Sequence, residues 1–262
     1  MSARNLKQMM DLGDRVALVT GGSRGLGLQI AEALGEQGAR VAITARKKNE
    51  LDEAVAHLEA RGIATAAWVC DLGKKEQIDP AAGRILAHYG KVDILVNNAG
   101  TTWAAPAETH PLEAWEKVIN LNLTAVFILS QIIGLRSMIP QKWGRIINNA
   151  SVAGLIAPDR RIMRGVAYNT SKAGLIGLTR SLAAEWGTHG ITVNAVCPGF
   201  FPSKMTAGLL DEPTTNRILD GTPTGRLGNN EDLKGVIALM ASDAGRHITG
   251  QAIAVDGGVT AI

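Results

Sequence analysis

Seven short apolar runs recur along the chain, and the intervals between them are long enough to hold helices. Strands that are apolar almost throughout and alternate with helical stretches are typical of a parallel sheet buried on both faces. The runs lie at residues 15–22, 39–46, 64–71, 92–100, 144–151, 191–199 and 251–258. This pattern predicts a single α/β domain over residues 1–262, with a doubly wound parallel sheet of about seven strands and helices on both faces.

The composition narrows the class of protein. Hydrophobic residues make up 46% of the 262 residues, enough for a sizeable core, and the formal net charge is only +3. Because the basic residues are spread along the chain, we expect neither a nucleic-acid nor a membrane partner. Residues 1–14 lack the apolar core of a signal peptide, and the apolar run 123–135 is too short to span a bilayer.

Cysteine and histidine usage indicates a cytoplasmic protein without a metal site. Cys70 and Cys197 lie apart in apolar runs, as buried thiols of a reducing compartment do. None of the histidines has a second ligand at the spacing of a known metal motif. They are His57, His88, His110, His189 and His247.

One region breaks the alternation. Residues 200–229 are rich in proline and glycine and show no clear period. A long irregular insertion in a compact domain is usually a functional loop, so we interpret 200–229 as a substrate loop or lid.

A glycine-rich turn follows the first apolar run and opens a helical stretch. Its glycines are Gly21, Gly22, Gly25 and Gly27. Glycine is needed where a backbone turns tightly and approaches a pyrophosphate, and the following helix presents free amides and a positive dipole end to the phosphates. The strand–turn–helix context predicts a Rossmann-type dinucleotide site, although the spacing differs from G-x-G-x-x-G.

Tyr168 and Lys172 stand four residues apart, just before a long apolar-periodic stretch. If that segment is helical, the two side chains share one face. The spacing alone leaves two possibilities open, a catalytic pair or two polar residues on a solvated surface.

Taken together, the motifs resemble the short-chain dehydrogenase/reductase family over nearly the whole chain. The glycine turn has the family's TGxxxGxG form, and "NNAG" at 97–100, "NLTAVF" at 122–127 and "SVAG" at 151–154 follow in the family's order. "YNTSK" at 168–172 matches Tyr-x-x-x-Lys, and "PGFFPSKM" at 198–205 resembles the Pro-Gly motif. The resemblance implies that Tyr168 and Lys172 are catalytic.

The resemblance implies four catalytic residues. Tyr168 would be the general acid for carbonyl reduction, with Lys172 lowering its pKa and binding the nicotinamide ribose. Ser151 would hydrogen bond to the substrate oxygen, and Asn122 would hold a water for proton relay to the lysine. Asn120 is a weaker candidate, and Trp103 would either wall the substrate pocket or pack in the ordinary way.

The resemblance also implies a set of cofactor contacts. Asp71 would contact adenine, and the segment at 97–100 would line the adenosine side of the cleft. Ser203 replaces the usual threonine but keeps its hydroxyl. The full set is Gly21, Ser23, Arg24, Gly25, Leu26, Gly27, Arg46, Asp71, Leu72, Asn97, Ala99, Gly100, Tyr168, Lys172, Pro198, Gly199, Ser203 and Met205.

The end of the second predicted strand indicates which nucleotide is bound. NAD-dependent enzymes commonly place an acidic residue there, whereas this chain has Ala45 followed by Arg46 and Lys47. Arg24 adds a guanidinium suited to a phosphate. We therefore predict a preference for NADP(H) over NAD(H); the alternative is that Arg46 and Lys47 merely begin a solvated helix.

The segment between Ser151 and Tyr168 is about four residues longer than in most family members. It carries Arg160, Arg161 and Arg164. These arginines are either a solvated basic loop or a recognition site for an anionic substrate, such as a coenzyme A thioester or an acyl carrier protein.

The leading functional hypothesis is an NADP(H)-dependent reductase of a ketone or 3-oxoacyl substrate. The alternatives are a sugar-acid or secondary-alcohol dehydrogenase and a non-catalytic nucleotide-sensing protein. The segment 248–258 resembles the family's interface strand and predicts a homotetramer.

Overall fold

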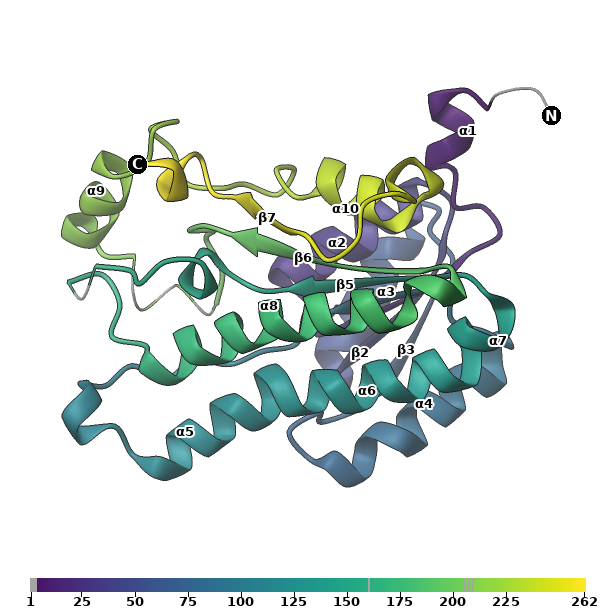
Figure 1. Ribbon diagram of the computed structural model, residues 1–262, viewed down its shortest axis with the longest axis horizontal. Coiled ribbons are helices and arrows are strands. Elements are labelled where there is room, and N and C mark those ends of the chain that lie inside the picture. Colours follow the sequence, from purple (N-terminus) through teal and green to yellow (C-terminus); the bar gives the residue numbers. More distant parts are fainter. Residues whose placement is uncertain (1–3, 160, 205, 207, 209) are drawn as a thin grey trace.

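A single parallel sheet forms the centre of the molecule (Figure 1). The computed structural model describes residues 4–159, 161–204, 206, 208 and 210–262. Seven strands lie in the order β3-β2-β1-β4-β5-β6-β7, and every neighbouring pair is parallel. The strands are β1 (Val16–Thr20), β2 (Arg40–Ala45), β3 (Thr65–Val69), β4 (Ile94–Asn97), β5 (Gly144–Asn149), β6 (Ile191–Pro198) and β7 (Ala252–Val255). The predicted α/β fold and its seven strands are confirmed.

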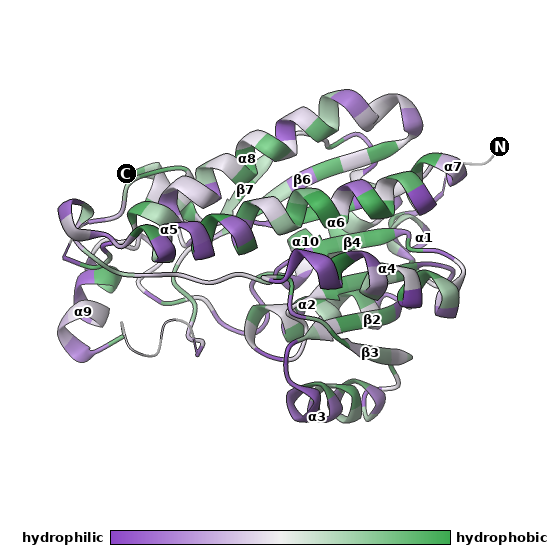
Figure 2. Ribbon diagram, turned by 90° about the horizontal axis from the view of Figure 1, so that it is seen from below, coloured by the Kyte–Doolittle hydropathy of each residue, from purple (hydrophilic) through white to green (hydrophobic). Residues whose placement is uncertain are grey.

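Helices cover both faces of the sheet. One face carries α2 (Gly25–Glu36), α3 (Lys48–Glu59) and α10 (Lys234–Ala241), whose apolar side chains join one buried cluster with the strands. The other face carries α4 (Lys75–Tyr89), α6 (Ala125–Ile133) and α8 (Val166–Trp186), which share a second cluster. Figure 2 shows the apolar strands between these layers and the largely hydrophilic α3 at the edge of the molecule. Burial on both faces explains why the strands are apolar almost throughout.

The order of the strands reverses at the centre of the sheet. β1 pairs with β2 on one side and with β4 on the other. In open α/β sheets, ligands bind outside the carboxyl ends of the strands at such a switch point. The glycine turn after β1 and the "NNAG" segment after β4 both lie at this point.

A long helical segment, Leu112–Gln141, runs along the second face. It combines α5 (Leu112–Ile119), α6 and α7 (Ile139–Gln141) with two π-helical turns, η2 (Asn120–Thr124) and η3 (Gly134–Met138). By length and composition this segment could cross a bilayer, which the apolar run 123–135 alone could not. Its side chains Leu129 and Ile133 pack into the second cluster, so it is a structural helix of this domain.

Residues 200–229 are less irregular than their sequence indicates. They contain α9 (Glu212–Asp220), which begins at an N-cap where the Asp211 side chain accepts a hydrogen bond from the Thr214 N–H. Asp211 followed by Pro213 in the first helical turn is a helix-start signal that the interpretation as an aperiodic loop overlooked. The helices α1 (Leu6–Met10) and α9 lie outside the two main layers (Figure 1).

Candidate functional site

The glycine turn between β1 and α2 forms a cradle that a side chain would fill. A Cβ atom on Gly27 would lie 2.2 Å from the Gly21 carbonyl oxygen and 2.5 Å from Asn98 Nδ2. Gly21 and Gly25 have φ values of +64° and +54°, a region that favours glycine. Ser23 lies in this turn, and Leu26 packs from α2 against the first cluster. The turn therefore requires glycine at these positions and leads into the N-terminus of α2; its contact with a pyrophosphate stays a prediction.

Asn98 ties the two central loops together. Its Nδ2 donates to the carbonyl oxygens of Thr20 and Gly21 at 2.8 and 3.2 Å, and its Oδ1 accepts from Asn149 Nδ2 at 2.8 Å. The Thr20 hydroxyl accepts from the amides of Asn98 and Ala99. Sequence reasoning missed Thr20, Asn98 and Asn149; the signal was a polar residue at each of three neighbouring strand ends.

The Asn97 side chain points into the protein interior. It is buried, and its Nδ2 donates to Ser130 Oγ and to Asn148 Oδ1. Asn97 can therefore offer a nucleotide only its main chain, whereas Ala99 and Gly100 are partly exposed in the loop that follows. The two asparagines of "NNAG" have different roles because successive residues of a strand point to opposite faces.

At the end of β3, Asp71 shapes a tight turn. Its Oδ1 accepts from the Gly73 N–H at 3.0 Å, and its own N–H donates to Gln77 Oε1 at 2.9 Å. Leu72 packs against the second cluster. Asn120 donates from Nδ2 to the Gly73 carbonyl oxygen, a structural bond across to this turn.

Basic side chains gather at the end of β2. Arg24 Nη1 lies 2.8 Å from Glu50 Oε1, and Lys47 Nζ lies 3.4 Å from the same oxygen. Arg46 is exposed one residue beyond the strand. Ala45 ends β2 without a carboxylate, so Glu50 on α3 is the acidic group of this corner.

Ser151 and α8 are held in contact by a close backbone approach. The Ser151 hydroxyl accepts from the Ala153 N–H at 3.1 Å and thereby caps the short 3-10 turn η4 (Val152–Gly154). A Cβ atom on Gly154 would lie 2.6 Å from the Lys172 carbonyl carbon. Glycine at 154 therefore lets the serine segment rest directly on the helix that carries Tyr168 and Lys172.

Tyr168 and Lys172 lie on the first turns of α8, so the predicted helix and shared face are confirmed. Lys172 is buried, and its Nζ donates to the Asn149 carbonyl oxygen at 2.6 Å. The Nζ lies 5.6 Å from the centre of the Tyr168 ring. Burial lowers the pKa of Lys172 to about 8, while Cys197 acts in the opposite direction.

The phenol differs from expectation in this structure. Burial raises the pKa of Tyr168 above its ordinary value, and interaction with the Ser151 side chain opposes that rise. Lys172, which is expected to lower this pKa, instead donates a hydrogen bond from its ammonium group to the Asn149 carbonyl, and its own pKa is lowered by burial.

Asn122 sits in the π-helical turn η2, which no periodicity in the sequence indicates. Its Oδ1 accepts from the Thr101 N–H, and its Nδ2 donates to the Thr101 carbonyl and to Ser171 Oγ, all within 2.9–3.0 Å. A Cβ on Gly100 would meet both Asn122 Oδ1, at 3.3 Å, and Lys172 Nζ, at 3.8 Å. Asn122, Gly100 and Lys172 are thus immediate neighbours. π-Turns inside α-helices are frequent at functional sites.

The segment after β6 reaches over the glycine turn. Pro198 ends β6, and the Gly199 N–H donates to the Val255 carbonyl oxygen at 3.0 Å. Among the described residues, and apart from the neighbours of Gly25 in the chain and the nearby backbone of α2, the Ser203 Cβ is the only atom within 4 Å of a Cβ placed on Gly25, at 3.9 Å. Ser203 Oγ lies 3.1 Å from Thr206 Oγ1, a partner that sequence reasoning missed. Met205 lies outside the described residues.

The arginine loop and its neighbours form the rim of the site. The Ala105 N–H donates to the Arg164 carbonyl oxygen, which brings the segment after Trp103 beside the segment before Tyr168. Arg161 pairs with Asp159 through its Nε and Nη2 atoms. Arg164 is exposed, and Arg160 lies outside the described residues.

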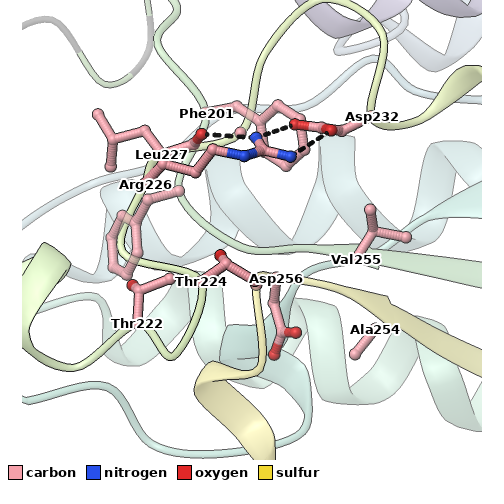
Figure 3. Close-up of a pocket in the computed structure, with 12 residues that line it drawn as sticks. Phe201, Thr222, Thr224, Arg226, Leu227, Asp232, Ala254, Val255 and Asp256 are labelled. Atoms are coloured by element: carbon pink, nitrogen blue, oxygen red, sulfur yellow. Dashed lines mark hydrogen bonds and ion pairs between the residues drawn. The ribbon is translucent and has the colours of Figure 1, made fainter.

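A cavity of about 270 Å³ lies beyond the ends of β6 and β7 (Figure 3). Arg226 forms one wall and binds both oxygens of Asp232 at 2.6 and 2.8 Å. Asp256 projects from the opposite side, where its carboxylate accepts bonds from Gly258 and Thr260. Ser151, Tyr168 and Lys172 do not line this cavity.

Comparison with known proteins agrees with this architecture. The family model described as short chain dehydrogenase matches residues 15–214. The chain is 37% identical to gluconate 5-dehydrogenase of Gluconobacter oxydans (strain 621H), over 93% of this chain and 94% of that protein. It is 39% identical to 3-oxoacyl-(acyl-carrier-protein) reductase of Escherichia coli (strain K12), over 95% and 99%.

A solved structure of gluconate 5-dehydrogenase from Burkholderia cenocepacia J2315, in complex with NADP and tartrate, superposes with a TM-score of 0.93. The two chains are 31% identical, and the match covers 98% of this chain and 100% of that one. With the fold, the glycine cradle and these matches, the chain belongs to the short-chain dehydrogenase/reductase family of oxidoreductases.

Proposed function

We propose that this enzyme interconverts a carbonyl and a secondary alcohol with NADP(H), acting on a ketone or a 3-oxoacyl substrate. One observation carries the proposal. The carboxyl ends of β4 and β5 bring together Ser151, Tyr168, Lys172 and Asn122, beside the glycine turn that opens α2. A fold that merely sensed the nucleotide would have no need for this group.

The proposed roles follow from the chemistry of each group. When bound, the nicotinamide supplies or accepts the hydride. Tyr168 donates a proton to the substrate oxygen in reduction and accepts it in oxidation. The Ser151 hydroxyl donates a hydrogen bond to the oxygen where charge develops. Lys172 binds ribose hydroxyls, and in its charged form it favours the phenolate of Tyr168.

Proton supply involves Asn122. The π-turn gives the main chain around Asn122 an i→i+5 bond, from the Ala125 N–H to the Asn120 carbonyl. The Asn122 side chain is fully engaged with Thr101 and Ser171, so we assign the relay water to its main-chain carbonyl.

NADP(H) is the proposed nucleotide. Arg24 and Lys47 meet beside the end of β2, Arg46 is exposed next to them, and Ala45 offers no carboxylate to a ribose 2′-hydroxyl. The NADP in the Burkholderia relative's complex supports the same choice.

The rim of the site favours an apolar substrate. Among the described residues, Trp103, Leu155, Ile156 and Val166 are large apolar side chains that remain 37–42% exposed. They come from the segments that follow Gly100 and Ser151 and precede Tyr168. Exposed apolar groups at the mouth of a site suit an acyl or alkyl chain better than a polyol. Arg161 is already paired with Asp159, which weakens the case for a carboxylate or phosphate clamp in this loop.

A sugar-acid dehydrogenase is the second candidate. Two of the relatives described above are gluconate 5-dehydrogenases, and one was solved with tartrate. Exposed Arg164 could bind a substrate carboxylate. We further propose a homotetramer in the reducing cytoplasm, consistent with the free, buried thiols of Cys70 and Cys197.

The mechanism is tested by Tyr168→Phe. Because the change removes the proton donor and little else, turnover should fall by about a thousandfold while nucleotide affinity is retained. The only other tyrosine, Tyr89, donates to the Val41 carbonyl in β2 and supplies the matched control, Tyr89→Phe. Steady-state NADPH oxidation and a nucleotide titration measure both quantities. Near-normal turnover of Tyr168→Phe would overturn the assignment.

The substrate class is tested by a series of 3-oxoacyl thioesters of increasing chain length, compared with a keto acid of a six-carbon sugar. The apolar rim predicts that kcat/KM rises with chain length, by about fourfold for each CH₂ pair that becomes half buried. Replacing Ile156 by Ser should flatten the rise. A higher kcat/KM for the sugar acid would select the second candidate.

A further inference from the structure

Three basic side chains from three separate segments meet at one carboxylate oxygen. Arg24 Nη1, from the glycine turn, lies 2.8 Å from Glu50 Oε1, and Lys47 Nζ, from the end of β2, lies 3.4 Å from it. Lys204 Nζ lies 3.7 Å from the same atom. Lys204 belongs to the segment after β6, far from the other two residues in sequence.

The position of Lys204 follows from its neighbours. Ser203 lies over Gly25 of the glycine turn, and its amide donates to Thr206 Oγ1 at 2.8 Å. The next residue, Lys204, therefore extends from above the glycine turn toward the first turn of α3, where Glu50 lies. Its side chain crosses the corner at which the sequence predicts the 2′-phosphate.

The charges at this corner do not balance. Three cations face one carboxylate. Burial alone would raise the pKa of Glu50. The three cations Lys47, Arg24 and Lys204 outweigh burial and lower this pKa below its ordinary value. Glu50 is therefore charged at neutral pH, and the four groups keep a formal charge of about +2. A phosphate monoester carries about −1.5 to −2 at pH 7 and accepts several charge-assisted hydrogen bonds.

The exposed fractions of the four side chains show which of them can contact a ligand. The Glu50 side chain is 17% exposed, whereas Arg24, Lys47 and Lys204 are 46, 61 and 70% exposed. The carboxylate of Glu50 is therefore mostly buried, while the three cations that contact it remain exposed to solvent. This arrangement suits an anion that arrives from outside and shares the cations with Glu50.

We propose that Lys204 is a specificity-determining residue that binds the 2′-phosphate of NADP(H) together with Arg24 and Lys47. The inference rests on the proposed function, and it adds a cation from the segment after β6 that the sequence motifs do not indicate. Glu50 orients the three cations. Lys204 thereby contributes to the choice between NADP(H) and NAD(H).

The test is direct binding by titration calorimetry, with NADP⁺ and NAD⁺ as the two probes. Lys204→Ala should weaken NADP⁺ binding by about three- to tenfold, the range for an exposed charge pair or a weak charged hydrogen bond, and leave NAD⁺ within twofold. The control is Lys48→Ala, which removes an exposed lysine of α3 that pairs with Asp52 and not with Glu50. It should change neither affinity.

Glu50→Gln separates a direct phosphate contact from an indirect one. If Lys204 binds the phosphate, its loss should weaken NADP⁺ in the Glu50→Gln background as well. If Lys204 only neutralises Glu50, Lys204→Ala should have no effect in that background, which would overturn the inference.

The remaining outcomes are also decisive. Equal weakening of NADP⁺ and NAD⁺ would place Lys204 at the pyrophosphate and contradict a 2′-phosphate role. A protein that prefers NADP⁺ and keeps the full preference in Lys204→Ala would refute only this inference. An unmodified protein that binds neither nucleotide would refute the proposed function itself.

Discussion

Lys172 is an ammonium group in a place where little water reaches it. Its Nζ donates to the Asn149 carbonyl, and burial lowers its pKa from an ordinary 10.5 to about 8. Near neutrality the folded protein therefore keeps a charge that the unfolded chain would solvate better. A perturbed pKa of this kind is expected at a functional position, which is the role proposed for Lys172.

This residue predicts a defined pH dependence of stability. Below about pH 8 the lysine is charged in both states, so the burial penalty is fully present. Between about pH 8 and 10.5 the folded state loses the proton while the unfolded state keeps it, and the penalty is relieved as pH rises. The Lys172→Met variant lacks the titrating group. Its stability relative to the unmodified protein should therefore fall by about 1–3 kcal/mol between pH 7 and pH 10.

Urea unfolding of both proteins at the two pH values measures this difference. Other titrating groups contribute almost equally to both chains and largely cancel. A difference that stays constant with pH would show that Lys172 titrates at its ordinary value.

At the scale of elements, the position of Ser151 relative to Tyr168 and Lys172 depends on how closely η4 packs against α8. Gly154 allows the approach, since a Cβ there would lie 2.6–2.9 Å from backbone atoms of Lys172 and Ala173. Backbone cannot move aside as a flexible side chain can. Either the serine segment or the start of α8 must shift when this glycine is replaced.

Gly154→Ala should therefore destabilise the protein by about 1–3 kcal/mol, the range for overpacking, and reduce kcat by displacing Ser151 from Tyr168. Gly177 of α8 is a matched control because, in the part of the chain that the structure describes, no atom outside the nearby backbone of α8 would lie within 4 Å of its Cβ. Gly177→Ala should raise stability by about 0.5–1 kcal/mol and leave kcat unchanged. Urea unfolding measures the stability of both variants, and steady-state kinetics measures their kcat. Equal stability and equal kcat of the two variants would show that η4 can shift to accommodate the methyl group at no cost in stability or activity.

At the scale of the whole molecule, the sheet ends at β7, an edge strand whose one partner among the described strands is β6. Its four residues, Ala252–Val255, are apolar and only partly buried. An apolar edge invites pairing with another chain. This edge is the structural basis for the proposed homotetramer.

Light scattering at micromolar concentration should give four times the mass of one chain. A charged residue in place of Ile253 should lower that mass by weakening association through β7. A monomer mass for the unmodified protein would reject the proposal, and an unchanged mass in the variant would move the interface elsewhere.

The sequence by itself determined the fold class and predicted which groups react. Alternating apolar runs suffice for a parallel sheet, because burial on both faces leaves few other ways to hide them. The four-residue spacing of Tyr168 and Lys172 suffices to place both on one helical face. The glycines of the turn after β1 were likewise readable, because only glycine tolerates that backbone.

Only the tertiary structure decided how these groups are paired and charged. It separated buried Asn97 from Asn98, turned Lys172 toward Asn149, and placed Asn122 in a π-turn. It also brought Lys204 to Glu50 across about 150 residues of chain. Such contacts join segments distant in sequence, and pKa values depend on burial that they create. Local sequence patterns therefore predict neither the long-range contacts nor the pKa values.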